Sequence, residues 1–127
     1  MLQLVAAANH RVKVFEWSVA FKGVSSTASP ILVQLIRQTT AGTMSAATPV
    51  KLNSGDDESL QTTAQKTATA EPTGSEVIDS IEVHPQAGYT WQAPFGAELC
   101  VKGGERLGLV VTAAADVNCN CKFFFEE

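Results

Sequence analysis

Short runs of β-branched and aromatic residues, separated by clusters of glycine, proline, serine, asparagine and aspartate, recur along this chain. Such runs are typical of β-strands, and the clusters are typical of the turns between them. No segment keeps a 3.6-residue apolar repeat over the roughly ten residues that a helix needs. The chain is therefore predicted to be all-β.

Eight or nine strands are expected within one domain, residues 1–127, which is long enough to bury a single core. So many strands in one small domain predict a β-sandwich or a barrel. The expected strands are Leu2–Ala7, Val12–Lys22, Ile31–Gln38, Thr62–Ala70, Glu76–His84, Tyr89–Ala93, Leu99–Lys102, Arg106–Ala113 and Asn118–Glu126.

The strand Val12–Lys22 changes phase along its length. Phe15 and Trp17 point to one face together with the apolar residues that follow them, whereas Val12 and Val14 point to the other. We therefore expect either a β-bulge near Val14 or burial of both faces of this strand.

The run Ile31–Gln38 is apolar on both faces, because Leu32 and Ile36 lie opposite its other apolar side chains. Antiparallel sheets commonly bury one face and leave the other to solvent. The second face of this strand is therefore expected to meet either a neighbouring subunit or a loop of the same chain.

Two arrangements are open around Gly103-Gly104. In a hairpin, a loop of residues 103–105 would pair Val101 with Leu107 and keep the apolar faces together. This register is preferred, unless the glycines turn a corner between two sheets.

The middle of the chain, residues 39–76, is small, polar and rich in threonine and alanine. It predicts only weak strands, with exposed turns at Asn53–Asp57 and Pro72–Gly74. Long polar loops on a rigid sandwich either fill space or carry a binding surface, and both interpretations stay open.

The net charge of −4, with lysine and arginine never in runs, argues against a nucleic-acid partner. The apolar runs are far shorter than the ~20 residues of a membrane span, and the N-terminus lacks the pattern of a secretory signal. Three cysteines, an odd number, favour thiols made in a reducing cytoplasm. We expect a soluble protein that is synthesised in the cytoplasm and does not contact a membrane.

A zinc site could be drawn from Cys119 and Cys121, with Cys100 and His84 as the remaining ligands. In an extended strand, however, the first two cysteines share a face with Phe123, which should point into the core. The favoured interpretation is a set of core thiols without a metal, and a regulatory disulfide is the other alternative.

Patterns for catalysis are missing from the sequence. His10 and His84 are the only histidines and lie far apart, whereas a cupin metal site needs two histidines one residue apart. No G-x-S-x-G elbow occurs and no Cys–His pairing is evident. Glu76 and Glu82 share a face with His84, but charged residues on the outer face of a strand are the simpler explanation.

Two further motifs also favour structural roles. The acidic run Asp56-Asp57-Glu58 lacks the alternating spacing of a calcium loop, and Gly103-Gly104 precedes neither the lysine nor the helix of a phosphate loop. We therefore predict that the protein is not an enzyme and has no catalytic residue, cofactor or metal site.

The segment HPQAGYTWQAPFG, His84–Gly96, is the densest stretch of the chain. Tyr89, Trp91 and Phe95 share one phase of an extended segment that two prolines bracket and stiffen. Such a strip either closes one end of the core or presents rigid aromatic anchors to a partner.

Several segments together resemble a family of small all-β virion proteins from tailed phages and their prophages. The most specific are LIRQTTAGT at Leu35–Thr43 and VHPQAGYTWQAPFG at Val83–Gly96, and the likeness runs from about Ala6 to Glu127. The resemblance implies a capsid decoration (cement) protein, an antiparallel β-sandwich of jelly-roll-like type. It would bind the outside of the major capsid shell as a homotrimer and stabilise it.

On this interpretation the partner is the major capsid protein and the location is the capsid surface of the virion. Residues Met1–Asn9 are expected to form an extended arm that packs against a neighbour or the shell. The alternative is a carbohydrate- or receptor-binding jelly roll of a phage tail or fibre, with Tyr89 and Trp91 stacking on sugar rings beside Gln86 and Gln92. The interface candidates are Leu2, Leu4, Leu32, Ile36, Tyr89, Trp91 and Phe95.

Overall fold

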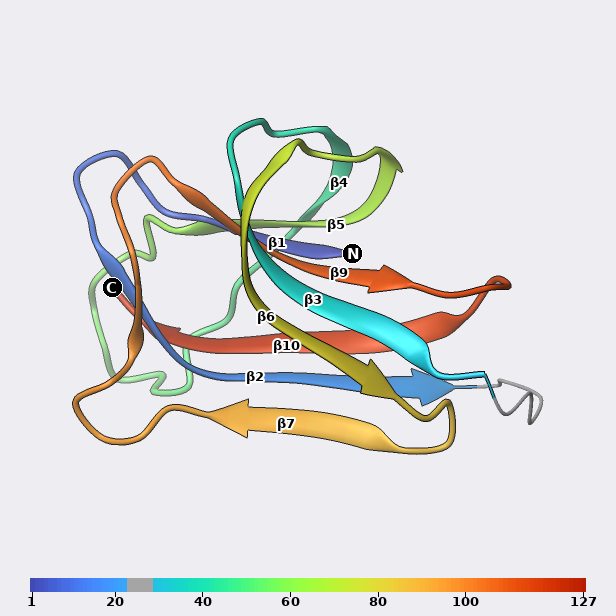
Figure 1. The fold of residues 1–127 in the computed structure, drawn as a ribbon. Coiled ribbons are helices and arrows are strands. Elements are labelled where there is room, and N and C mark those ends of the chain that lie inside the picture. The colour runs from blue at the N-terminus through green and yellow to red at the C-terminus, as the bar shows by residue number, and fades with distance from the viewer. Residues whose placement is uncertain (23–28) are drawn as a thin grey trace.

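The computed structural model describes residues 1–22 and 29–127, which form two antiparallel sheets packed against each other (Figure 1). The predicted antiparallel β-sandwich is confirmed, and its jelly-roll character stays a prediction. The strands are β1 (Leu2–Val5), β2 (Val12–Lys22), β3 (Ile31–Gln38), β4 (Thr43–Ala47), β5 (Thr63–Ala70), β6 (Gly74–Val83), β7 (Gly88–Gln92), β8 (Leu99–Val101), β9 (Arg106–Thr112) and β10 (Asn118–Glu126). Among the described residues, no helix is long and apolar enough to cross a membrane.

The larger sheet has six strands in the order β4-β5-β1-β9-β3-β6. The smaller sheet is built around β2, which pairs with β10 along one edge and with β8 and then β7 along the other. Both sheets turn alternate side chains inward, so the core lies between them. Its buried apolar residues are Leu4, Ala6, Val12, Val14, Trp17, Val19, Ile31, Val33, Leu35, Val83, Val101, Leu107 and Leu109.

The strand β2 contains the bulge that its change of phase predicts. The pairing with β10 shifts by one residue at Phe15, so that Val14 and Trp17 both turn inward and are buried. Phe15 lies outside the core cluster. The prediction that it shares a face with Trp17 is therefore wrong, because Phe15 is itself the extra residue of the bulge.

Gly103-Gly104 turns a corner between the two sheets. The strand β8 pairs with β2, whereas β9 lies between β1 and β3, so the preferred hairpin register is wrong and the alternative corner is confirmed. The apolar run before the glycines lies in the smaller sheet, and the run after them lies in the larger sheet. Both runs turn buried side chains, such as Val101 and Leu107, into the core between the sheets. The Gly104 amide lies 3.2 Å from the carbonyl oxygens of both Ala6 and Ala7, which ties the corner to the β1–β2 connection.

Substitution of Gly103 by alanine is expected to lower the free energy of unfolding by about 1–3 kcal/mol, because overpacking displaces the backbone. A Cβ atom at this position would lie 2.5 Å from the carbonyl oxygen of Ala8. The control is Gly55→Ala, where the added Cβ meets no atom within 4 Å, and its effect should stay within about 0.5 kcal/mol. Urea denaturation measures both variants, and equal midpoints would contradict this account of the corner.

Residues Met1–Asn9 do not form an arm. Their strand β1 lies inside the six-stranded sheet, paired with β5 on one side and β9 on the other. Leu4 is 1% exposed and Leu2 packs against the core, so these two interface candidates are core residues. The arm prediction is wrong because β1 lies between β5 and β9 and forms backbone ladders with both strands.

The opposite face of β1 is also covered. Gln3 is fully buried there, and its Nε2 donates a hydrogen bond of 2.7 Å to Oε1 of Gln38 on β3. The two strands are not adjacent, since β9 lies between them. Gly108 of β9 makes room for this contact, because a Cβ there would lie 2.4 Å from the Gln38 side chain.

The strand β4 brings the number of described strands to ten, so the expected eight or nine is too few. Its sequence, TMSAA, lacks the usual β-branched pattern, and pairing with β5 at the edge of the sheet defines it. The turn Asn53–Asp57 is exposed as predicted. Within Pro72–Gly74, however, Pro72 is buried, because it lies in close contact with the backbone at Gly42.

Candidate interaction surface

One end of the sandwich carries a groove of about 720 Å³ between the last residues of β10 and the β4–β5 connection, residues 48–62. Figure 1 shows the C-terminus at the same end as this green connection. The apolar residues that line the groove are Phe15, Val50, Leu52, Leu60, Phe123, Phe124 and Phe125. The acidic residues that line it are Asp56, Asp57, Glu58, Glu126 and Glu127.

The C-terminal residue fixes the connection against β10. Both carboxylate oxygens of Glu127 accept hydrogen bonds from backbone amides, that of Gln61 at 2.7 Å and that of Thr62 at 2.8 Å. Burial alone would raise the pKa of Glu127, but the hydrogen bonds from Thr62 and Gln61 outweigh it and lower the pKa. Within the connection, Lys51 Nζ donates to the carbonyl oxygen of Asp56 at 2.5 Å. These bonds fix the connection that forms one wall of the groove.

Large apolar side chains are exposed at this end of the molecule. Val50 is 84% and Leu52 is 80% exposed, and both line the groove. Phe95, which is fully exposed, lies in the β7–β8 connection, where the amide of Ala93 donates to the carbonyl of Phe15 at 2.8 Å. Exposed apolar side chains gathered in one region are typical of contact surfaces.

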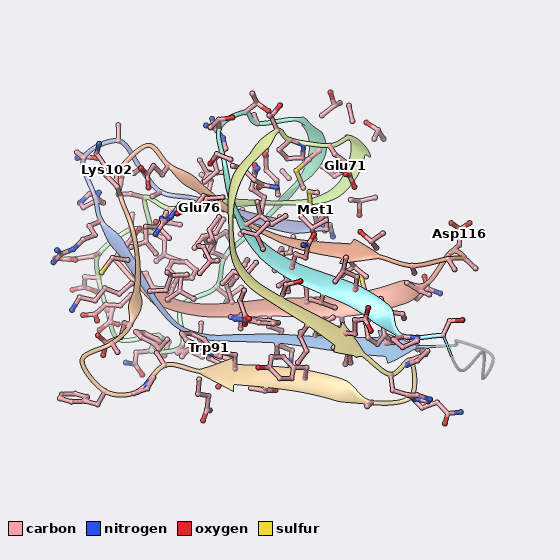
Figure 2. All side chains as sticks on the ribbon, viewed as in Figure 1. Met1, Glu71, Glu76, Trp91, Lys102 and Asp116 are labelled. Carbon is pink, nitrogen blue, oxygen red and sulfur yellow. The ribbon has the colours of Figure 1, made fainter. Side chains whose placement is uncertain are left out.

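The aromatic stretch closes the core and also projects from it. Tyr89 and Trp91 on β7 are half-buried and pack against the core, and the Tyr89 ring centre lies 5.1 Å from that of Trp17. Trp91 is labelled in Figure 2 beside β7. Of the three predicted aromatic anchors, only Phe95 points fully into solvent.

A second pocket, of about 580 Å³, lies beside these aromatic residues. Tyr89, Trp91 and Ile78 contribute apolar surface to it, and Asp79 and Glu98 contribute carboxylates. This pocket therefore combines aromatic rings with hydrogen-bond acceptors at the edge of the sandwich.

The outer face of β3 carries the remaining interface candidates. Leu32 and Ile36 are half-buried and lie outside the core cluster, opposite the buried residues of the same strand. The start of β6 approaches this face, since a Cβ on Gly74 would lie 3.0 Å from Cγ2 of Ile36. The contact of this face with a neighbouring subunit stays a prediction.

The other chemical candidates are dispersed. Nδ1 of His84 accepts a hydrogen bond of 3.2 Å from the amide of Gln86, and Glu76 pairs with Arg37 at 3.1 Å. Cys100 is exposed on β8. Across residues 1–22 and 29–127, no three His, Cys, Asp or Glu side chains are placed to hold a metal ion.

Cys119 and Cys121 form a close pair on one face of β10. Their Sγ atoms lie 3.9 Å apart, and both side chains are partly buried against the core, in agreement with the predicted core thiols. The hydrogen bond from Cys121 lowers the pKa of Cys119 to about 6. The same hydrogen bond, together with burial, raises the pKa of Cys121. The two thiols therefore titrate as a proton-sharing pair, in which the thiolate is favoured on Cys119 and disfavoured on Cys121.

A titration of ultraviolet thiolate absorbance is expected to show one thiolate forming with an apparent pKa of about 6. The variant Cys121→Ala should lose this step, because the hydrogen bond that stabilises the thiolate is gone. The control Cys100→Ala, which changes an exposed thiol elsewhere, should keep it. If the folded protein forms no thiolate below the ordinary thiol range of about 8.5, the proton-sharing pair is wrong.

The groove residues were not predicted as a site. The sequence predicts the connection to be either a filler loop or a binding surface, and neither Val50 nor Leu52 is among the predicted interface residues. The usable signal was the alternating Val50-Lys51-Leu52 within a polar loop, followed closely by the acidic run at Asp56. Comparison with protein-family models, with curated proteins and with solved structures returned no match for this chain.

Proposed function

We propose that this chain is a phage capsid decoration (cement) protein, which binds the outside of the major capsid shell without catalysing a reaction. The observation that carries the proposal is the exposed apolar surface at one end of a well-packed sandwich. Val50, Leu52 and Phe95 are exposed there, more fully than Val77 and Ile78 on β6, which are the other large apolar side chains exposed among the described residues. Such a surface suits attachment to another protein.

Attachment of this kind stabilises a shell by repetition. Each copy buries a modest area, but binding to the assembled shell favours that state over the dissociated subunits by mass action. A homotrimer presents three copies of the surface at once, so its second and third contacts form at high effective concentration. Leu32 and Ile36, half-buried on the outer face of β3, are the proposed contacts between subunits.

Co-sedimentation of the purified protein with expanded, undecorated shells of the encoding phage tests the proposal, together with light scattering for the mass in solution. We expect saturable binding at a fixed copy number per capsid subunit and the mass of a trimer. Unexpanded shells and an unrelated phage's shells serve as controls. Absence of saturable binding to expanded shells would contradict the assignment.

The second candidate function is glycan or receptor binding at a phage tail or fibre. The pocket beside Tyr89 and Trp91 favours it, because aromatic rings next to Asp79 and Glu98 can stack on a sugar and accept its hydroxyl hydrogen bonds. A glycan array tests this candidate with the native protein and with Trp91→Ala. Binding that is lost in the variant, while its circular dichroism spectrum is retained, would replace the capsid assignment.

A further inference from the structure

The groove between β10 and residues 48–62 has an apolar floor with an acidic border. Phe15, Leu60 and the phenylalanines of β10 line it, and Val50 and Leu52 present largely exposed side chains to it. An occupant therefore has to bring apolar side chains that gain by leaving water.

The charges around the groove are strongly one-sided. Five carboxylates line it, those of Asp56, Asp57, Glu58, Glu126 and Glu127, against one ammonium group, that of Lys51. The Lys51 ammonium is already bonded to the carbonyl of Asp56. No ion pair within residues 1–22 and 29–127 involves any of the five carboxylates. The border therefore attracts a cationic partner and repels an anionic one.

The same imbalance argues against a second copy of this chain as the occupant. The chain carries a net charge of −4, and a symmetric contact would place one acidic border against another. A simple cation is also a poor occupant, because the described side chains form no cluster that could ligate a metal and the floor is apolar. A polypeptide segment with mixed chemistry satisfies both parts of the groove.

We propose that this groove binds a segment of a partner protein in which leucine, phenylalanine or similar anchors are flanked by lysine or arginine. The inference rests on the proposed function in taking the segment from a subunit of the capsid shell. The anchors would cover Val50 and Leu52, and the basic residues would face the acidic run at Asp56-Asp57-Glu58. Because Glu127 holds the connection in place, the site is formed before the partner arrives.

The test is an NMR titration of the full ¹⁵N-labelled chain with a short capped peptide in which leucine and phenylalanine alternate with lysine. Two matched peptides test the two contributions to binding separately. Glutamate replaces lysine in the peptide that tests the charge contribution, and serine replaces leucine and phenylalanine in the peptide that tests the apolar contribution. We expect saturable amide shifts confined to residues 50–62 and 123–127 with the first peptide only. Absence of shifts, shifts spread over the molecule, or equal binding of the serine peptide would overturn the proposal.

Two double variants of the protein separate the apolar contribution to peptide binding from the contribution of charge. Val50→Ser/Leu52→Ser and Asp56→Asn/Asp57→Asn should each weaken binding by about tenfold or more, and the remaining charge dependence should fade at high salt. All four positions are exposed, so the fold should persist. The control is Glu71→Gln/Asp116→Asn, which removes the same charge from exposed sites away from the groove, labelled in Figure 2. An equal loss of peptide binding in this control would mean that net charge alone causes the effect, and it would overturn the proposal.

The same variants separate this inference from the proposed function. If native protein co-sediments with shells and Val50→Ser/Leu52→Ser does not, both stand. If both proteins co-sediment equally, the groove is not the shell contact, and only the inference fails. If the peptide binds in the groove but native protein ignores shells, the groove stands and the capsid assignment fails. A trimer mass that Val50→Ser/Leu52→Ser reduces would make the groove a contact between copies, which overturns the inference.

Discussion

Deletion of Met1–Val5 is expected to abolish the folded sandwich. These residues form β1, which pairs with β5 on one side and β9 on the other, so their loss separates the six-stranded sheet into two parts. Loss of a buried leucine such as Leu4 alone costs about 2–5 kcal/mol. A domain of this size has a total stability of about 5–15 kcal/mol, so the lost ladders and packing together should exceed it.

Circular dichroism and the dispersion of amide NMR signals measure this outcome. The control is insertion of Gly-Ser-Gly after Gly55 in the exposed turn, which lengthens a loop and should cost less than about 1 kcal/mol. A truncated protein that unfolds at the native midpoint would show that the N-terminal residues are dispensable. They would then form the arm expected from the sequence, and their place in the sheet would be wrong.

The second large effect is expected at Trp17. This side chain is 1% exposed, is the largest in the core, and packs with its ring centre 5.1 Å from that of Tyr89. The variant Trp17→Ala should lose about 3–5 kcal/mol of unfolding free energy, since it leaves a cavity between the sheets. Chemical denaturation monitored by circular dichroism measures the loss.

Phe95→Ala is the matched control, because it truncates an aromatic side chain that is fully exposed. Its effect on stability should stay within about 0.5 kcal/mol. Comparable losses at Trp17 and Phe95 would mean that the burial assigned to these two aromatic residues is wrong. If the protein binds the capsid as proposed, Phe95→Ala should weaken binding to shells although it leaves the fold intact.

Alternation of apolar residues predicted most of the strands, because a two-residue repeat follows directly from burial of one face of a sheet. The phase change in β2 even located its bulge to within one residue of Phe15. What alternation cannot show is the strand that each run pairs with. The runs around Gly103-Gly104 suit a hairpin and a corner equally well locally, and only packing against β2 and β1 decides between them.

One strand, β4, and the place of another, β1, are not predicted from the sequence, for the same reason. The strand β4 has a weak local preference and exists through its ladder with β5, which no short-range pattern encodes. The N-terminal strand has the right pattern, but a strand at the end of a chain can pack inward or outward, and its place between β5 and β9 depends on the whole sheet.

The candidate surface was harder to predict than the fold. The aromatic rings of Tyr89 and Trp91 predict an interface, yet alternation along β7 turns both side chains toward the core. Val50 and Leu52 alternate with Lys51 in a polar loop, but so short a pattern does not show that both side chains stay exposed once the loop is placed against β10. The hydrogen bond that the Thr62 amide donates to the Glu127 carboxylate joins residues far apart in the sequence and fixes one wall of the groove.

A cryo-electron microscopy reconstruction of expanded shells reconstituted with the purified protein tests the central proposal most directly. The proposal predicts density for the sandwich at symmetry-repeated positions on the outer surface of the shell. The end that carries Val50, Leu52 and Phe95 should face the capsid protein. Shells without added density, or density confined to the tail, would contradict a decoration role.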